Sequence, residues 1–209
     1  MQQLEQRSPE WFKARAGKVT ASRVKDVLAK GQGLTRAAYM GELIAETLTG
    51  QPANPFKGNA DTERGNELEP AARLCFEIET GESVTEVGGF VHPRMPRVAA
   101  SPDGILSGNR GLELKCPRPH VHLEYLLGGK PPPAYVPQMA LQAACGELDS
   151  VVFASYCPLF PADLQLFVVT YTPTMEYLQE MEAAIAEFLK EMDDKLKKIE
   201  ALRSQAIAQ

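Results

Sequence analysis

Apolar residues recur at steps of three and four in several stretches of the chain, which is the spacing of one face of an α-helix. The longest such stretch follows Pro173, with Glu and Lys between the apolar positions. Its apolar members are Met175, Leu178, Met181, Ile185, Phe188, Met192, Leu196 and Ile199. We expect one long amphipathic helix here. Its first half should pack on a sheet, and its end, 193–209, should project toward a neighbouring subunit or fray.

Shorter helices are expected earlier in the chain. One begins at Ser8 and Pro9, since Ser caps a helix and Pro fits its first turn. Another begins near Thr20, where hydroxyls and backbone N–H groups at the helix start favour an anion. The remaining helices are expected at 36–49, ending at Gly50, at 61–80 with an irregularity at Pro70, at 121–127 and at 134–145.

Strand-forming residues lie between the helix at 61–80 and the long one, at 83–91, 98–101, 151–156 and 164–171, together with a hairpin near residue 105. The order helix, three strands, helix, strand, strand, helix predicts an α/β fold, in which a mixed central β-sheet is flanked by helices. With 209 residues and 44% hydrophobic content, the chain is long enough for one sizeable core. We expect a single domain, 1–209, with a helical part at 1–80, the sheet at 81–172 and the long helix at 173–209.

Charge and composition narrow the class of protein. A net charge of −5 argues against a protein that coats nucleic acid generally, although a cleft can be basic while the exterior is acidic. No apolar run reaches the ~20 residues that span a bilayer, and the N-terminus lacks the order of a signal peptide. We therefore expect an intracellular, cytoplasmic protein. Basic residues are enriched in the first third of the chain, at Arg15, Lys18, Arg23, Lys25, Arg36, Lys57 and Arg64.

The cysteines and histidines do not form a metal-binding pattern. Cys75, Cys116, Cys145 and Cys157 are dispersed without a Cys-x-x-Cys pair, so we expect buried apolar cysteines and neither zinc nor an iron–sulfur cluster. His92, His120 and His122 have no carboxylate or cysteine at ligand spacing, and we interpret all three as bystanders.

Two carboxylates and an amine lie close together in the segment 101–115. Asp103 is in a Pro-Asp-Gly turn, and Glu113 and Lys115 point the same way from a strand whose Leu114 points into a core. Folding this hairpin about Gly108 or Asn109 is expected to bring Asp103 opposite Leu114 or Lys115, and diagonal to Glu113. Such a pair of carboxylates can hold one hard cation.

Each feature alone has an ordinary explanation, since Glu-x-Lys on a strand is often a solvated ion pair and Pro-Asp-Gly is often only a turn. The acid, the hairpin and the Glu-x-Lys in this order form the Pro-Asp…(Asp/Glu)-x-Lys motif of nucleases. A core of restriction-endonuclease type is therefore expected.

Beyond this motif, the chain resembles the lambda-exonuclease (YqaJ-type viral recombinase) family over nearly its full length. The resemblance rests on six short sequence motifs. They are Trp-Phe-Lys-Ala-Arg-Ala-Gly-Lys-Val-Thr-Ala-Ser at 11–22, Arg-Gly at 64–65, Glu-Pro-x-Ala-Arg at 69–73, Ser-Pro-Asp-Gly at 101–104, Gly-Leu-Glu-Leu-Lys-Cys-Pro at 111–117 and Tyr-Val-Pro-Gln at 135–138. The resemblance implies a Mg²⁺-dependent exonuclease that degrades one strand of linear double-stranded DNA in the 5′ to 3′ direction. The remaining 3′ overhang would serve recombination by strand annealing.

The resemblance also implies roles for individual residues. Asp103, Glu113 and the Leu114 carbonyl would hold a pair of Mg²⁺ ions, for which Mn²⁺ is an alternative, and Lys115 would activate or hold the attacking water. Glu69 matches an upstream acid near the metals, and Gln138 matches an active-site amide. The 5′-terminal phosphate would be held by Arg15, Thr20, Ser22 and Ser101. One departure is Pro93, which stands where the family has an acidic residue.

Partners follow from the resemblance as well, namely a homotrimeric ring, a single-strand annealing protein and 5′-phosphorylated DNA ends. The loop at 51–58 is a candidate gate for the DNA. Two other classes of function stay open. One is an endonuclease or single-strand exonuclease on the same core, and the other is a noncatalytic DNA-binding protein.

Overall fold

The computed structural model describes residues 1, 3–29, 34–53 and 60–207, and its strands form two mixed sheets. In the first sheet β1 (Val19–Thr20) runs parallel to β3 (Val98–Ala100), and β2 (Phe90–Val91) pairs antiparallel with β3. The second sheet has the order β4-β5-β6-β7, with the parallel pair β5 and β6 at its centre. Its strands are β4 (Gly104–Leu106), β5 (Arg110–Lys115), β6 (Ser150–Tyr156) and β7 (Leu166–Tyr171). The expected α/β fold, with mixed β-structure flanked by helices, is confirmed, although the strands form two sheets where one central sheet was expected.

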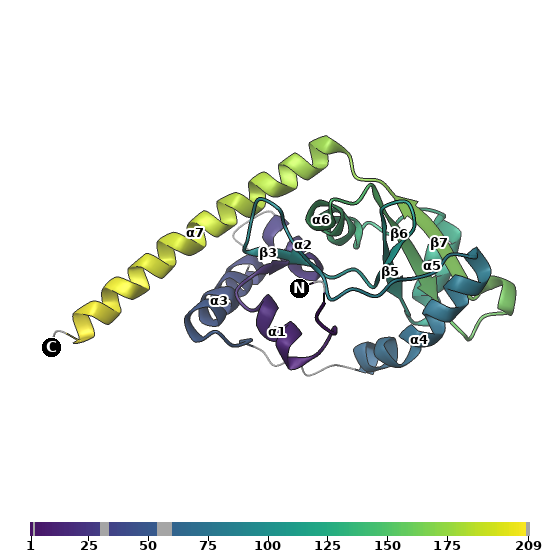
Figure 1. Ribbon diagram of the computed structural model, residues 1–209, viewed down its shortest axis with the longest axis horizontal. Coiled ribbons are helices and arrows are strands. Elements are labelled where there is room, and N and C mark those ends of the chain that lie inside the picture. The colour runs from purple at the N-terminus through teal and green to yellow at the C-terminus, as the bar shows by residue number, and fades with distance from the viewer. Residues whose placement is uncertain (2, 30–33, 54–59, 208–209) are drawn as a thin grey trace.

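Seven α-helices are present in the described part of the chain, and α6 lies between the two sheets (Figure 1). Their bounds are α1 Pro9–Arg15, α2 Val24–Leu28, α3 Leu34–Thr49, α4 Ala60–Thr80, α5 Pro119–Gly128, α6 Val136–Gly146 and α7 Met175–Ile207. Short 3-10 helices occupy Ala21–Arg23 and Ala162–Leu164. The Ser8 side chain accepts a hydrogen bond from the backbone N–H of Trp11, which confirms the expected cap of α1.

Strand periodicity gives β5 two different faces. Leu112 and Leu114 pack with Ala72 and Phe76 of α4 on one face of the four-stranded sheet. On the opposite face, residues of α6 pack against Val151 and Phe153 of β6. Because side chains alternate along a strand, Glu113 faces α6 while Leu114 faces the core under α4, as expected.

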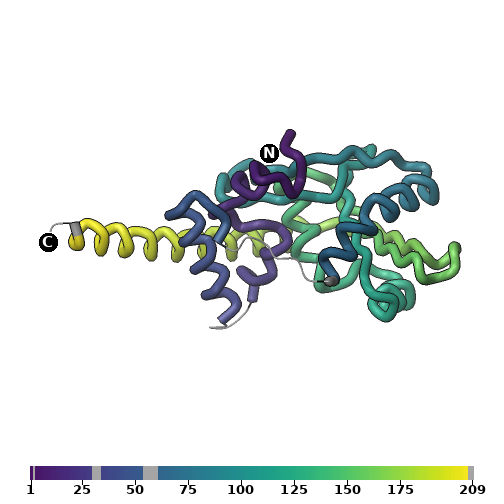
Figure 2. The backbone as a smooth tube through the Cα atoms, turned by 90° about the horizontal axis from the view of Figure 1, so that it is seen from below, coloured from purple at the N-terminus to yellow at the C-terminus, as the bar shows by residue number. Residues whose placement is uncertain are grey.

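The helix α7 begins at Met175 and is as long as predicted, but its partners differ from the prediction. It contacts α2, α3 and α6, and its apolar side chains join the core that surrounds β1 and β3. The helix α7 does not pack on the four-stranded sheet, because α4 and α6 already cover that sheet's two faces. Figures 1 and 2 show the last turns of α7 extending away from the rest of the molecule.

Three other local predictions are corrected. The helix expected near Thr20 begins at Val24, because Val19 and Thr20 instead pair with β3. Within 83–91 only Phe90–Val91 is a strand, and Thr85 adds an isolated bridge to Ile105. Pro70 lies inside an unbroken α4. The candidate gate falls largely on 54–59, which is outside the described residues.

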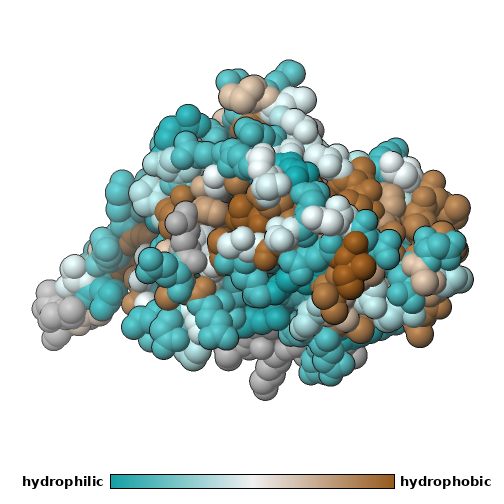
Figure 3. Space-filling model, turned by 45° about the vertical axis from the view of Figure 1, so that its right-hand side comes forward, coloured by the Kyte–Doolittle hydropathy of each residue, from teal (hydrophilic) through white to brown (hydrophobic). Residues whose placement is uncertain are grey.

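The surface and the cysteines complete the description. Several large apolar side chains are exposed, including Leu74 and Ile78 of α4 and Leu127 of α5. Figure 3 shows hydrophobic patches among hydrophilic residues on the side where the four-stranded sheet lies. All four cysteines are free, but only Cys145 and Cys157 are buried as expected, and the other two are half-buried. Within the described residues, none of the helices combines the length and the apolar character needed to cross a bilayer.

Candidate active site

The β4–β5 hairpin places Asp103 directly opposite Glu113. Gly104 pairs with Leu112 in the ladder, and the Asp103 backbone N–H donates to the Leu112 carbonyl over 2.8 Å. The prediction that Asp103 faces Leu114 or Lys115 is therefore wrong. The hairpin does turn about Gly108, one of the two expected centres, since Leu106 pairs with Arg110, but a turn centred there places residue 103 opposite residue 113. Residues opposite each other in a ladder share a face, so the two carboxylates are brought closer than a diagonal arrangement would bring them.

The half-buried Asp103 is held by the strand that follows it. Its Oδ2 accepts a hydrogen bond from the Leu114 backbone N–H over 2.7 Å. Burial raises the pKa of Asp103 to about 7, and the nearby Glu113 charge raises it further than Lys115 lowers it. Burial and the neighbouring Glu113 carboxylate thus both disfavour the charged form of Asp103.

Glu113 is only 1% exposed and is surrounded by donors. Lys115 forms an ion pair with its Oε1, and the Gln138 amide nitrogen donates to the same oxygen over 2.6 Å. The Gln142 amide nitrogen donates to Oε2 over 2.5 Å. Sequence reasoning assigned Gln138 to this site but not Gln142, although both lie one helical turn apart on one stripe of α6.

Lys115 is the cation nearest the predicted oxygen ligands. Besides Glu113, its Nζ contacts the Leu114 carbonyl oxygen at 3.2 Å and lies 5.3 Å from the centre of the Tyr135 ring. Burial alone would lower the pKa of Lys115, but Glu113 and Asp103 together raise it above its ordinary value. Lys115 therefore stays an ammonium near neutral pH.

The donor set fits a hard divalent cation. Among the described residues no three His, Cys, Asp or Glu side chains already stand together as a metal cage, and Glu69 is turned toward Arg7 and Arg73. The Glu113 carboxylate and the Leu114 carbonyl nevertheless both contact the Lys115 ammonium, and the Leu114 backbone N–H holds the Asp103 carboxylate beside them. An all-oxygen set of this kind suits a hard divalent cation such as Mg²⁺, Mn²⁺ or Ca²⁺ rather than Zn²⁺.

A cavity of about 640 Å³ opens onto these residues. Asp103, Glu69, Leu114, Lys115 and Tyr135 line it, whereas the buried Glu113 and its hydrogen-bond partner Gln138 are not among the lining residues. Its basic wall consists of Arg7, Arg64, Arg118 and His120. His120 thus lies in the site cavity, while His92 and His122 make structural contacts, the first with Glu182 and the second with Ser155 and the Leu164 carbonyl.

A second cavity of about 570 Å³ contains three of the four residues predicted to bind the end phosphate, Arg15, Thr20 and Ser22. The Arg15 guanidinium lies 4.1 Å above the Trp11 ring, and its Nη1 donates to the fourth predicted residue, Ser101, over 2.9 Å. Burial lowers the pKa of Arg15 to about 10, which still leaves it charged at neutral pH. Three of the four residues thus line this cavity, and Ser101 is joined to it by its contact with Arg15.

Thr20 does not act as the predicted helix cap. A 3-10 helix follows it, the Thr20 side chain forms no cap hydrogen bond, and its backbone N–H donates to the Tyr39 hydroxyl over 3.1 Å. Of the other basic residues, Lys18 and Arg23 line the second cavity, Arg64 lines the first, and Arg36 pairs with Glu191 on α7. Lys25 is exposed outside both linings, and Lys57 is outside the described residues.

The two cavities adjoin, since Arg7, Thr62 and Asn66 line both of them. Ser101 and Asp103 connect them along the chain, because the first contacts Arg15 and the second belongs to the carboxylate cluster. Two residues of extended chain separate their roots by roughly 7 Å.

Comparison with known proteins identifies the family. The model of the YqaJ-like viral recombinase domain matches residues 10–149, whereas none of the curated protein sequences matches this chain. An alkaline exonuclease from Laribacter hongkongensis (LHK-Exo) is 40% identical over 95% of this chain and 100% of its own, with a TM-score of 0.88. The same protein in complex with dAMP gives a TM-score of 0.89 at 40% identity over the same shares of both chains.

A more distant structure agrees in fold. A phage-related exonuclease from Haemophilus somnus is 14% identical, with a TM-score of 0.67 over 87% of this chain and 96% of its own. The family model and the LHK-Exo match together cover both the carboxylate cluster and the Arg15 cavity. The chain belongs to the YqaJ-like viral recombinase family.

Proposed function

We propose that this protein is a Mg²⁺-dependent exonuclease that removes nucleotides from the 5′ end of one strand of linear double-stranded DNA and leaves a 3′ overhang. Family membership and the name of its 40% identical relative, an alkaline exonuclease, support the class of reaction. The observation that carries the direction of travel is the contact between Arg15 and Ser101, two residues before Asp103. A terminal phosphate at Arg15 would place the next phosphate of the strand near the carboxylates.

The spacing between the two cavities supports removal of one nucleotide at a time. The Cα atoms of Ser101 and Asp103 are separated by roughly 7 Å, so the Arg15 contact and the carboxylates lie within reach of neighbouring nucleotides of one strand. The dAMP bound to LHK-Exo is a mononucleotide, which is the product expected from such a step. A 5′-phosphate preference follows, because an arginine fork binds a phosphate dianion far better than a hydroxyl.

The residues of the chain divide the chemistry between them. Asp103, Glu113 and the Leu114 carbonyl would hold the metal, which when bound neutralises charge on the scissile phosphate and activates water. Lys115 stays protonated beside them and would hold the attacking water in line or lower its pKa. Gln138 and Gln142 act through Glu113, since both amide nitrogens donate to its carboxylate. Glu69 supplies a further negative charge at the cavity wall.

The proposal extends to the assembly by analogy with the family. It includes a homotrimeric ring around the duplex, because enclosure prevents loss of DNA between successive cuts. It also includes a single-strand annealing protein that receives the 3′ overhang. Size-exclusion chromatography with light scattering tests the first, and a mass above that of three chains or below it would contradict the ring.

The experiment that tests the reaction class compares two duplexes with Mg²⁺ present, one linear and 5′-phosphorylated, the other covalently closed. The proposal predicts that the linear duplex is consumed and the closed circle survives. Cutting of the closed circle would indicate an endonuclease on the same core. If neither duplex is cut, the noncatalytic DNA-binding alternative is favoured.

A further inference from the structure

Arg7 is fixed in an unusual backbone conformation beside the active site. Its φ of 69° lies in the left-handed region, which residues with a side chain rarely adopt. The neighbours on both sides hold it there. The Gln6 side-chain nitrogen donates to the carbonyls of Val87 and Pro102, both at 2.8 Å, and Ser8 caps α1. The segment therefore directs the Arg7 side chain to one place.

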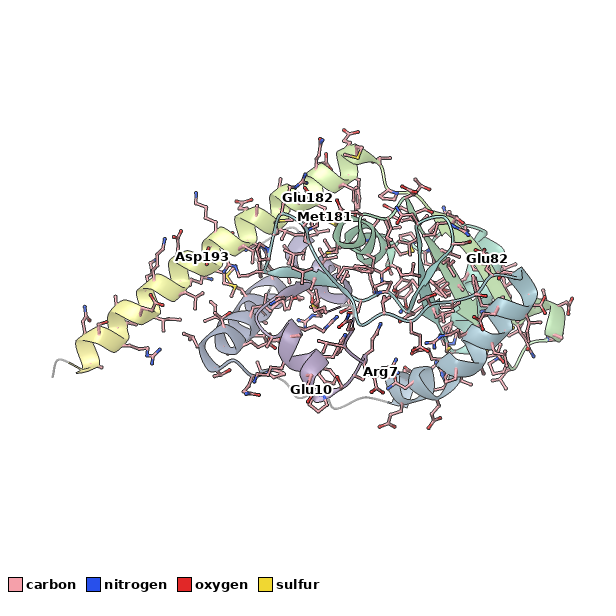
Figure 4. The ribbon with its side chains drawn as sticks, viewed as in Figure 1. Arg7, Glu10, Glu82, Met181, Glu182 and Asp193 are labelled. Atoms are coloured by element: carbon pink, nitrogen blue, oxygen red, sulfur yellow. The ribbon has the colours of Figure 1, made fainter. Side chains whose placement is uncertain are left out.

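That place is the boundary between the two cavities. Arg7 lines both the carboxylate cavity and the Arg15 cavity, together with Thr62 and Asn66 of α4. Figure 4 shows it between α1 and α4. A DNA strand whose end is at Arg15 and whose next phosphate is at Asp103 must pass these three residues. Arg7 is the charged member of the three.

Glu69, the ion-pair partner of Arg7, does not need Arg7 to balance its charge. Arg7 forms an ion pair with Glu69, but its side chain is 47% exposed, and an ion pair of such exposure is weak. Glu69 has a second partner in Arg73, whose Nη2 lies 3.2 Å from Oε1 and whose side chain is only 18% exposed. Glu69 thus keeps a cation when Arg7 moves away.

We propose that Arg7 binds a backbone phosphate of the DNA strand whose 5′ end occupies the Arg15 cavity, and that it exchanges Glu69 for this phosphate. The inference rests on the proposed function, because it names a phosphate contact within that site. A backbone phosphate offers Arg7 two oxygens for a bidentate contact and carries the same single charge as a carboxylate, while Glu69 keeps Arg73 as a partner. DNA binding and the Arg7–Glu69 ion pair are therefore coupled, since both use the same guanidinium.

The test measures binding of a fluorescent 5′-phosphorylated duplex over a range of salt, with EDTA present so that no strand is cut. Replacing Arg7 by Ala (R7A) should weaken binding roughly tenfold, the effect of losing one charge-assisted hydrogen-bonded contact. The slope of log affinity against log salt should fall by about one. R7G, which suits the left-handed backbone, should give the same loss, and this separates the side chain from any effect of strain.

R94A is the matched control. Arg94 also forms an exposed ion pair, with Glu182 of α7, and it lines neither cavity. Its replacement should leave both the affinity and the salt slope unchanged. A loss in R94A equal to that in R7A would show a general effect of net charge and would overturn the inference.

The E69Q background separates a phosphate contact from a purely structural ion pair. If Arg7 served only to hold Glu69, R7A would change nothing once residue 69 is an amide. The proposal predicts instead that E69Q binds the duplex more tightly than the wild type and that R7A removes that gain. If R7A and R7G bind the duplex as tightly as the wild type does, the Arg7 contact alone is overturned. Wild-type protein that fails to bind DNA ends at all would overturn the proposed function with it.

Discussion

Gln142 donates a hydrogen bond to Glu113 from a fully buried position on α6, with 2.5 Å between its Nε2 and the carboxylate Oε2. The carbonyl oxygen of the same amide is buried and has no hydrogen-bond partner among the described residues. A buried carbonyl left unpaired costs about 1–3 kcal/mol. This unpaired carbonyl lies beside a carboxylate that is itself almost completely buried, and we interpret Gln142 as a residue that positions Glu113.

Replacing Gln142 by Leu should separate activity from stability. The variant loses the hydrogen bond to Glu113 but also loses the unpaired carbonyl, so the free energy of unfolding should change by only about 1 kcal/mol. The rate of nucleotide release should fall about 10- to 100-fold, as is typical when the partner of a metal ligand is removed. Urea denaturation and a nuclease assay measure the two effects.

Gln165→Leu is the control for this change. Gln165 also donates to carbonyl oxygens, those of Pro158 and Phe160, but it lies outside the site cavity. The Gln165→Leu substitution should leave the rate of nucleotide release unaltered. Full activity in the Gln142 variant would contradict a positioning role.

Lys115→Ala should abolish cutting while end binding is retained. Loss of the ammonium removes the group that holds or activates the water, and a general acid–base residue typically contributes 10²–10⁴-fold to the rate. The Arg15 cavity is untouched by the change, so binding of a 5′-phosphorylated duplex in EDTA should stay within about threefold of the wild type. Anisotropy and a gel-based assay give the two readings. An active Lys115 variant would remove the proposed mechanism.

Asp103→Asn should stabilise the metal-free protein above neutral pH. The pKa of Asp103 is raised to about 7 in the fold, so folded protein binds more protons than unfolded protein, and stability falls as pH rises from about 4 to 7. Asn lacks this charge, yet its carbonyl can still accept from the Leu114 N–H. We expect a gain of about 1–3 kcal/mol at pH 8 in EDTA.

The same variant tests the metal site, because added Mg²⁺ should raise the Tm of the wild type and leave that of Asp103→Asn nearly unchanged. Differential scanning calorimetry across pH measures both effects. The exposed Asp149→Asn is the control, and it should show no gain in stability in EDTA and the same rise in Tm with Mg²⁺ as the wild type. Equal Mg²⁺ stabilisation of all three proteins would place the metal elsewhere.

Arg15→Ala should erase the preference for a 5′-phosphate. Arg15 stacks on Trp11 and donates to Ser101, so it is held ready for a terminal phosphate, and its loss should cost about 1.5–3 kcal/mol of binding to phosphorylated ends. Ends with a 5′-hydroxyl should be affected little. Arg36→Ala, which breaks an ion pair with Glu191 outside both cavities, is the control. A phosphate preference that survives in Arg15→Ala would contradict the anchor.

The sequence was sufficient to predict the α/β class and the carboxylates, because both depend on local rules. Alternation along one strand places Glu113 and Lys115 together, and a Pro-Asp-Gly turn places Asp103 at the hairpin start. The register was wrong by at least one residue, because a turn centred on Gly108 pairs residue 103 with residue 113, whereas the predicted partners 114 and 115 require a centre closer to Asn109.

Contacts between residues far apart in the sequence could not be predicted from the local spacing of residue types. Gln142 lies 29 residues from Glu113, and Arg7 lies 62 residues from Glu69. Only the packing of α6 and α4 on the sheet brings these pairs together. The strand at Val19 was missed for a similar reason, because two residues become a strand only when β3 is beside them.

The central claim is metal-dependent removal of nucleotides from a 5′ end, and one time course tests it most directly. Linear duplexes carrying a 5′-phosphate or a 5′-hydroxyl, with separate labels on the two ends of one strand, are incubated with Mg²⁺ or with EDTA. We predict that the 5′ label is released first as a mononucleotide, faster from the phosphorylated end, and only with Mg²⁺. Release of the 3′ label first, or equal release in EDTA, would contradict the account.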